Sequence, residues 1–164
     1  MIDLNLSLFS DSDLIGVYSH LLQELKSRGI IRTNNVVAEL GEYIAIEHYK
    51  KPLDLPTLSL SPTCTEAFDA TSSDGRRYSI KTTTRSTTGS FFGLPAPETN
   101  QAMNPPFDFL VVVKLDETYS PEYIIELTWE QFLKYRRWIP RQKAYRMPLN
   151  RNVQREARTI YTRA

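Results

Sequence analysis

The stretch "FDATSSDGRRYSIKTTTR", residues 68–85, predicts a β-hairpin at the centre of the fold. Its Asp74-Gly75 pair is a strong turn signal between two strand-like runs, which we expect at residues 66–71 and 76–83. Apolar and polar residues alternate in the second run, as they do in a strand with two different faces. The hairpin therefore brings side chains from both runs to one end of a sheet.

One aspartate and one lysine carry the chemistry of this hairpin. Asp69 lies in the first run and Lys81 in the second, and antiparallel neighbours lie only about 4.8 Å apart. A carboxylate beside an ammonium group suits metal-assisted hydrolysis of a phosphodiester bond. Asp69 would bind Mg²⁺ (or Mn²⁺), and Lys81 would position a water molecule or neutralise the developing charge.

A second carboxylate for such a site is expected from the helix predicted at residues 34–50, whose apolar residues recur every three or four positions. Glu39 and Glu42 are three residues apart and so lie on neighbouring parts of one helix face. Either residue is a candidate metal ligand.

The order of these parts resembles the PD-(D/E)xK nuclease superfamily, which includes type II restriction enzymes and defence nucleases. The likeness rests on "AELGEYIAIEHY", "FDA", "DGRRYSIK" and "FDFLVVV", and spans roughly residues 34–130. It is nearest to small bacterial proteins with a "DGRRYQVK"-like hairpin. The resemblance implies a restriction-endonuclease-like αβββαβ core with a mixed central sheet, and Mg²⁺-dependent cleavage of DNA in a bacterium or phage. In that pattern Asp69 is the main metal ligand, Lys81 the catalytic lysine and Glu39 the helix acid.

Ser79 departs from the superfamily pattern, because an Asp or Glu is expected two residues before the lysine. Serine brings no charge and is a weak cation ligand. Three interpretations follow. A carboxylate has migrated, with Glu39, Glu66 or Glu98 as its source; or one metal is held with help from the Ile80 carbonyl; or cleavage is lost and DNA binding is kept.

The charge of the chain is strongly polarised. Residues 131–164 hold ten Lys or Arg against the single acid Glu156, a net +9 that leaves −8 for residues 1–130. Such asymmetry often marks a phosphate-binding surface, although a solvated basic face or a disordered tail has the same composition. The candidate DNA-binding residues are Arg85, Arg136, Arg137, Arg141, Lys143 and Arg146.

The remaining elements complete an α/β domain with the predicted order α-α-β-β-β-β-α. A helix is predicted from Ser10 to Gly29, a loop at residues 50–63, strands at 107–115 and 122–127, and a helix capped by Thr128. The continuous apolar strand at 107–115 is typical of one covered on both faces. The long loop at 84–106, with Phe91 and Phe92, is expected to reach a DNA groove or to form a dimer interface.

Length and composition favour one cytoplasmic domain. The 164 residues divide into an N-terminal helix (1–32), a nuclease core (34–130) and a basic C-terminal segment (131–164). The single cysteine, Cys64, excludes an internal disulfide and a cysteine-based zinc cluster. No apolar run is long enough for a membrane helix, and the N-terminus lacks the basic region of a signal peptide. DNA is the expected partner, and a homodimer is expected because cutting both strands needs two sites.

Overall fold

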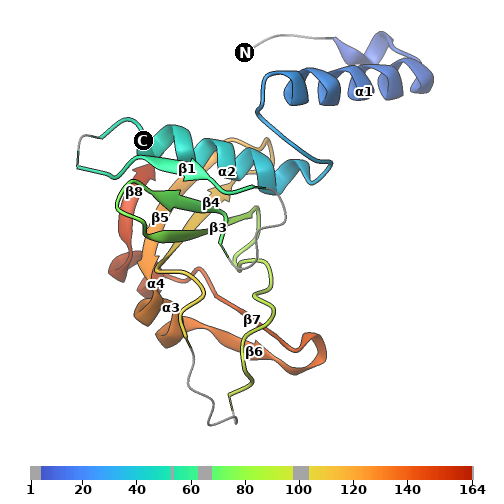
Figure 1. The fold of residues 1–164 in the computed structure, drawn as a ribbon. Coiled ribbons are helices and arrows are strands. Elements are labelled where there is room, and N and C mark those ends of the chain that lie inside the picture. The colour runs from blue at the N-terminus through green and yellow to red at the C-terminus, as the bar shows by residue number, and fades with distance from the viewer. Residues whose placement is uncertain (1–4, 53, 63–67, 98–103, 164) are drawn as a thin grey trace.

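A six-stranded mixed sheet lies at the centre of the protein, seen in a computed structural model that describes residues 5–52, 54–62, 68–97 and 104–163 (Figure 1). In space the order is β1-β2-β3-β4-β5-β8, where β3 and β4 are parallel and every other neighbouring pair is antiparallel. The prediction of an α/β domain with a mixed sheet is confirmed. The strands are β1 (Leu58–Leu60), β2 (Ala70–Ser72), β3 (Arg77–Thr83), β4 (Phe109–Leu115), β5 (Pro121–Thr128) and β8 (Arg158–Thr162).

The predicted hairpin is confirmed as β2-β3. Gly75 has φ +83°, a conformation that glycine adopts without strain. Ala70 pairs with Tyr78, and the ladder continues to Asp69, whose N–H donates to the Tyr78 carbonyl at 2.8 Å. Strand β2 is Ala70–Ser72, and Glu66, the expected first residue of this strand, lies outside the described residues.

Strand β4 is covered on both faces, as its apolar run predicts. Leu110 and Val112 face a cluster that includes Phe132, while Val111 and Val113 face a cluster that includes Tyr49. All four β4 side chains are fully buried. The sheet is therefore the middle layer between two hydrophobic cores.

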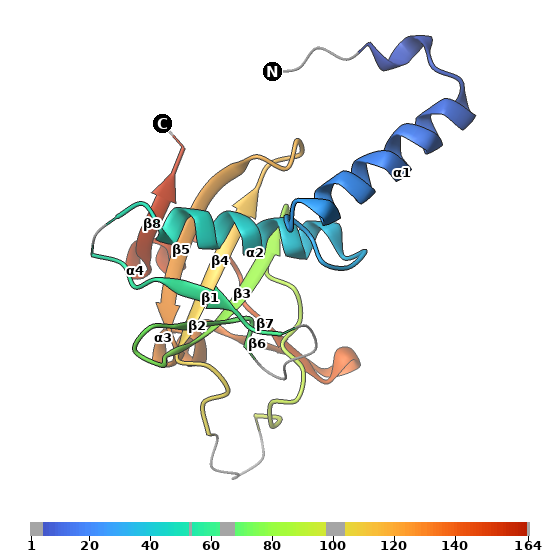
Figure 2. The same cartoon turned by 45° about the horizontal axis from the view of Figure 1, so that its top comes forward.

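Helix α2 (Val36–Tyr49) covers one face of this sheet and crosses its strands (Figure 2). Its buried residues Gly41, Ala45 and Tyr49 are four apart and lie in one row along the helix. A Cβ at Gly41 would lie 1.7 Å from the Oγ1 of Thr82 on β3, so only glycine lets helix and strand approach this closely. This contact fixes α2 against the strand that carries Lys81.

The other face is covered by the C-terminal third of the chain together with the long loop after β3. Helix α3 (Trp129–Tyr135) is capped by Thr128 as predicted, and Thr128 and Gln131 form a capping box. A two-stranded hairpin of β6 (Arg137–Ile139) and β7 (Ala144–Arg146), joined by the 3₁₀ turn η2 (Pro140–Gln142), follows it. Helix α4 (Arg151–Glu156) then leads into β8.

Helix α1 (Asp11–Ser27) extends away from the body in both views, after the 3₁₀ turn η1 (Leu6–Leu8). Ser10 and Asp13 form a capping box at its start, and Gly29, with φ +68°, lies just beyond its end as predicted. None of its residues is buried. Within the described ranges, no helix is long and apolar enough to cross a membrane.

Several sequence predictions about the elements were wrong. The Pro-rich segment at 50–63 contains β1, and the basic segment holds three strands and a helix beyond α3, so its described residues do not form a disordered tail. Between β3 and β4 the residues that the structure describes form no helix, where αβββαβ order has one. Phe91 is buried at 6% exposure, and only Phe92, at 70%, is exposed.

Replacing Gly41 by alanine should destabilise the fold by about 1–3 kcal/mol, because the new methyl group overlaps Thr82 and forces helix and strand apart. Gly16→Ala is the matched control, since a Cβ at Gly16 meets nothing within 4 Å. Urea unfolding would measure both variants. Equal midpoints for Gly41→Ala and wild type would contradict the close-packing argument.

Candidate active site and nucleic-acid interface

Asp69 lies at the end of the β2-β3 ladder. Its carboxylate, in place of a backbone carbonyl, accepts the next hydrogen bond from β3. Its Oδ2 accepts a hydrogen bond of 2.6 Å from the Ile80 N–H and one of 3.3 Å from the Ser79 hydroxyl. Both bonds use the same oxygen, so Oδ1 is the oxygen of this half-buried side chain that is left to approach a ligand. The Ile80 carbonyl points toward the same edge of β3 as its N–H, because both groups of an extended residue face one neighbouring strand.

Asp69, Ser79 and Lys81 line one open cleft of about 620 Å³. Its other walls are mainly aromatic and apolar, and they come from the long loop and from the start of β2. The Lys81 Nζ lies 5.4 Å from the centre of the Phe91 ring, within the range of a cation–π contact. The structure thus brings together three of the four predicted catalytic residues. The further lining residues are Phe68, Ser90, Phe91, Phe92, Gly93, Leu94, Pro106 and Phe107.

Glu39, the fourth predicted catalytic residue, faces the loop before α2. Its Oε2 accepts hydrogen bonds from the N–H groups of Arg32 and Thr33, the latter at 2.8 Å. Burial raises the pKa of Glu39, but these two N–H groups outweigh it, and the pKa lies below its ordinary value. In this structure, Glu39 holds the loop between α1 and α2.

Glu42 is the helix carboxylate that interacts with Asp69. Burial raises the pKa of Glu42 above its ordinary value, the charge of Asp69 raises it further, and Arg32 offsets part of the effect. The Arg32 guanidinium forms a 2.7 Å ion pair with Glu42 and also donates to the Ser61 carbonyl at 2.8 Å. Glu42 does not line the cleft itself.

The donors that could hold a cation are all oxygens. They are the carboxylates of Asp69 and Glu42 and the Ile80 carbonyl, and Mg²⁺ is commonly bound by one or two carboxylates plus substrate phosphate. Among the described residues no group of three or more His, Cys, Asp or Glu side chains comes together. Glu66 and Glu98, the other predicted sources of a carboxylate, lie outside those residues.

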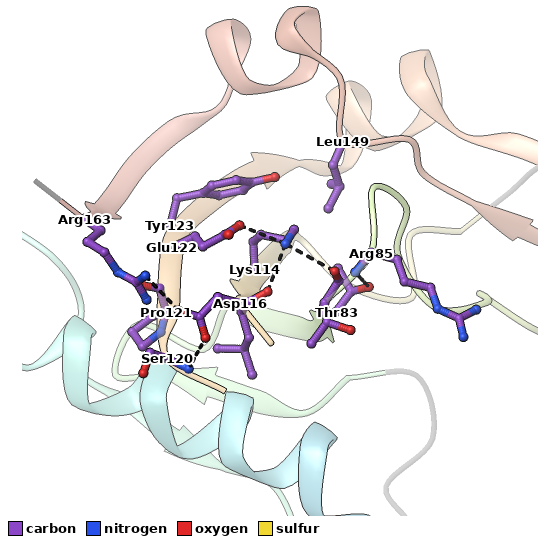
Figure 3. A network of polar contacts seen from close by, with 12 residues as sticks. Thr83, Arg85, Lys114, Asp116, Ser120, Pro121, Glu122, Tyr123, Leu149 and Arg163 are labelled. Carbon is purple, nitrogen blue, oxygen red and sulfur yellow. Dashed lines mark hydrogen bonds and ion pairs between the residues drawn. The ribbon is translucent and has the colours of Figure 1, made fainter. Parts of the chain in front are cut away.

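Arg85 projects from a tightly fixed turn after β3 (Figure 3). The Thr83 hydroxyl accepts from the Arg85 N–H at 3.0 Å and donates to the Thr87 carbonyl at 3.0 Å. Lys114 donates to the Thr84 carbonyl at 3.3 Å and pairs with Glu122 at 2.8 Å. The Arg85 side chain is exposed and points away from this network, so it can reach a ligand.

The β6-β7 hairpin carries four of the five other predicted DNA-binding residues, of which Arg146 is half-buried and the other three are exposed. Arg137 and Arg146 face each other across the two strands, and Arg141 and Lys143 flank the tip, where both are exposed. Arg136 lies differently: its guanidinium carbon is 4.4 Å from the centre of the Tyr145 ring, where it supports the hairpin.

The long loop ties this hairpin to the cleft. Phe91 and Tyr145 exchange two backbone hydrogen bonds, of 2.7 and 3.0 Å, so the loop runs antiparallel to β7 as a third strand-like segment. The Ser90 hydroxyl, which lines the cleft, accepts from the Arg146 Nε at 3.2 Å. The basic hairpin and the Asp69 cleft therefore share one wall.

Other bases of the C-terminal segment are neutralised inside the domain. Lys134 pairs with Glu156 and Arg163 with Asp116, at 2.7 and 2.8 Å. Arg158 pairs with Asp54 at 2.7 Å. The net +9 of the segment therefore overstates the charge that faces an outside ligand.

Sequence reasoning missed Arg32 and Ser90 as parts of this region. Arg32 lies before the predicted core at 34–130, and nothing in its spacing connects it with Glu42. Ser90 sits in a loop whose path depends on Tyr145, more than fifty residues later. Glu42 could have been preferred over Glu39 from the sequence, because it follows Gly41, and a glycine in a helix can mark close contact with a strand.

Comparison of the sequence with protein-family models gives no match, and comparison with curated proteins gives none.

Mn²⁺ should stabilise the wild-type protein against heat, because a ligand that binds only the folded state raises the melting temperature. Asp69→Asn and Glu42→Gln should each reduce that shift, whereas Glu39→Gln should retain it. The shift should grow as the pH rises through the raised pKa of Glu42, because a metal-binding carboxylate must be deprotonated.

Ser79→Asp is the complementary variant, since it supplies a second carboxylate beside Asp69, where its hydroxyl now donates to that residue. Differential scanning fluorimetry with and without Mn²⁺ should give a larger shift for this variant than for wild type. A shift that is the same in wild type, Asp69→Asn and Ser79→Asp would mean that the ion binds elsewhere.

Proposed function

We propose that the protein is a Mg²⁺-dependent endonuclease that hydrolyses phosphodiester bonds in DNA, of the restriction or phage-defence type. The observation that carries this proposal is the shared wall between the two parts of the site. Asp69 and Lys81 line a cleft whose Ser90 is hydrogen-bonded to Arg146 of the basic hairpin. A phosphate backbone lying along the hairpin would thus be delivered to the acid and the lysine.

The order of the elements also supports a restriction-endonuclease-like fold. Helix α2, the meander β1-β2-β3 and the parallel partner β4 follow one another, with Asp69 immediately before β2 and Lys81 on β3. The superfamily resemblance predicts these two residues in these two strands. The missing part is the second helix of the αβββαβ pattern, at least within the described residues between β3 and β4.

In this proposal each residue of the cleft has a separate task. Asp69 would hold the cation, while its Oδ2 accepts the hydrogen bonds from Ile80 and Ser79. The cation, when bound, polarises the scissile phosphate and lowers the pKa of an attacking water. Lys81 neutralises charge that develops on the phosphate, and Ser79 orients Asp69 instead of binding metal. Glu42, which lies outside the cleft lining, would supply the second carboxylate once released from Arg32.

A catalytically inactive DNA-binding module is the second candidate. Two observations favour it. Ser79 is uncharged where the superfamily has an acid, and the Arg32 guanidinium already neutralises Glu42. Incubating plasmid DNA with the protein and Mg²⁺ or Mn²⁺ separates the two candidates. Nicked or linear products support the nuclease, whereas salt-dependent binding without products supports the module.

If the protein cleaves DNA, Asp69→Asn and Lys81→Met should each lower the rate by at least about a hundredfold, because each removes charge that stabilises the transition state. Lys51→Met is the control, since Lys51 is an exposed lysine beyond the end of α2. The measurement is the initial rate of plasmid nicking, with circular dichroism to verify folding. A folded Asp69→Asn protein with the wild-type rate would rule out this assignment.

The same assay distinguishes the roles of the two α2 carboxylates, Glu39 and Glu42. Glu42→Gln should lower the rate, whereas Glu39→Gln should lower the stability and leave the rate of the folded fraction nearly unchanged. The reverse pattern would return the role of helix acid to Glu39.

The affinity for DNA should fall with rising salt concentration, and the bases of the β6-β7 hairpin should account for part of this dependence. Replacing Arg137, Arg141 and Lys143 by alanine should make the slope of log affinity against log salt shallower by up to about 3, because each phosphate contact contributes about 0.9. All three are exposed. The matched control replaces Lys51, Arg151 and Arg155, which are equally exposed and change the net charge by the same amount.

Fluorescence anisotropy at several salt concentrations measures both triple variants. The hairpin variant should bind all sequences more weakly, since phosphate contacts position DNA without reading its bases. Equal slopes for the two variants would show that only net charge matters and that the hairpin is not the interface.

A further inference from the structure

Helix α1 presents an apolar seam that is exposed over most of its length, with Leu25 half-buried. Leu14, Tyr18, Leu21 and Leu25 are spaced four, three and four residues apart, which is the a/d spacing of a coiled coil. The first three are 37%, 59% and 53% exposed, and Ile15 beside the seam is 71% exposed. An apolar surface of this kind on a protruding helix usually marks an interaction site.

The opposite side of the helix is polar. Ser12, Ser19, Gln23 and Ser27 lie there, so the seam has a clear boundary. A membrane surface is a poor partner, because helices that lie on membranes carry Lys and Arg along the polar side. Here residues 11–28 include three acids and two bases.

The charges at the two ends of the seam identify the partner. Asp11 lies three residues before Leu14, and Arg28 lies three residues after Leu25, both in line with the seam. The helix is thus acidic at its start and net basic at its end, where Lys26 and Arg28 outnumber Glu24, although Arg28 already pairs with Glu24 at 2.6 Å. An antiparallel copy of the same helix matches this pattern, whereas a parallel copy would set like charges side by side.

We infer that α1 is a dimerisation helix that pairs antiparallel with α1 of a second copy of this chain. A two-fold axis between residues 19 and 20 sets Tyr18 against Leu21 of the second copy, and Leu14 against Leu25. The same axis sets Asp11 against Arg28, so one register satisfies the apolar residues and the charges together. Such a self-complementary surface is what a two-fold symmetric interface requires.

The interface would leave the cleft open. No α1 residue lines the Asp69 cleft, and α1 extends away from the body in both views. The exposed Leu6, Leu8 and Phe9 extend the apolar surface beyond the N-terminal end of the helix. This inference does not rest on nuclease activity, because a DNA-binding module would dimerise in the same way.

Sedimentation velocity over a wide range of protein concentration tests the inference. The wild type should shift from monomer to dimer as concentration rises, and Leu14→Glu combined with Leu21→Glu should stay monomeric. Ser19→Glu combined with Gln23→Glu is the matched control on the polar side and should dimerise like the wild type. A wild type that is monomeric throughout, or a control that fails as the seam variant does, would overturn the inference.

Charge reversal tests the antiparallel register. Asp11→Arg and Arg28→Asp should each weaken self-association about tenfold, because each turns two attractive pairs per dimer into repulsive ones. An equimolar mixture of the two variants should recover dimers, since each end of the mixed dimer then sets one acidic side chain against one basic side chain. Absence of recovery, with both variants folded by circular dichroism, would exclude this register.

Discussion

The close contact between Gly41 and Thr82 is the constraint on which the rest of the site depends. It brings α2 onto β3 without an intervening side chain, and the residue that follows Gly41 is the carboxylate whose pKa the charge of Asp69 raises. The same contact lies one residue beyond Lys81 along β3. A single packing requirement therefore sets the helix acid, the strand acid and the lysine in relation to one another, while Arg32 and Glu39 fix the loop that leads into the helix.

The second organising feature is the long segment after β3. Its described residues form almost no regular structure, yet Thr83, Thr88 and Phe91 anchor it at successive points. Because Phe91 packs under Lys81 and pairs with Tyr145, the segment joins the cleft to the basic hairpin. The proposed chemistry and the proposed binding surface are thus parts of one connected layer and not two separate modules.

Sequence patterns predicted the elements whose signals are local. The Asp-Gly turn, the Thr128 cap and the apolar run of β4 each depend on neighbouring residues, and each was found where expected. Strand β1 was missed because three residues between prolines show no period, and β6, β7 and β8 were missed because short basic strands resemble a tail. Spacing alone could not decide between Glu39 and Glu42, since both lie on one helix face. The burial of Phe91 depends on Tyr145, 54 residues away, so no pattern in the neighbouring sequence predicts it.

The pairing of Arg137 with Arg146 has a consequence for the physical state of the hairpin. Residues of like charge that are paired directly across two strands are unfavourable, so this pair opposes the pairing of the ribbon. A polyanion that lies along it removes the repulsion, and so do high concentrations of simple anions. If nucleic acid binds here as we propose, folding of the hairpin and occupation of its surface would be linked equilibria. In this respect the nucleic acid would act as a structural component of the protein that binds it.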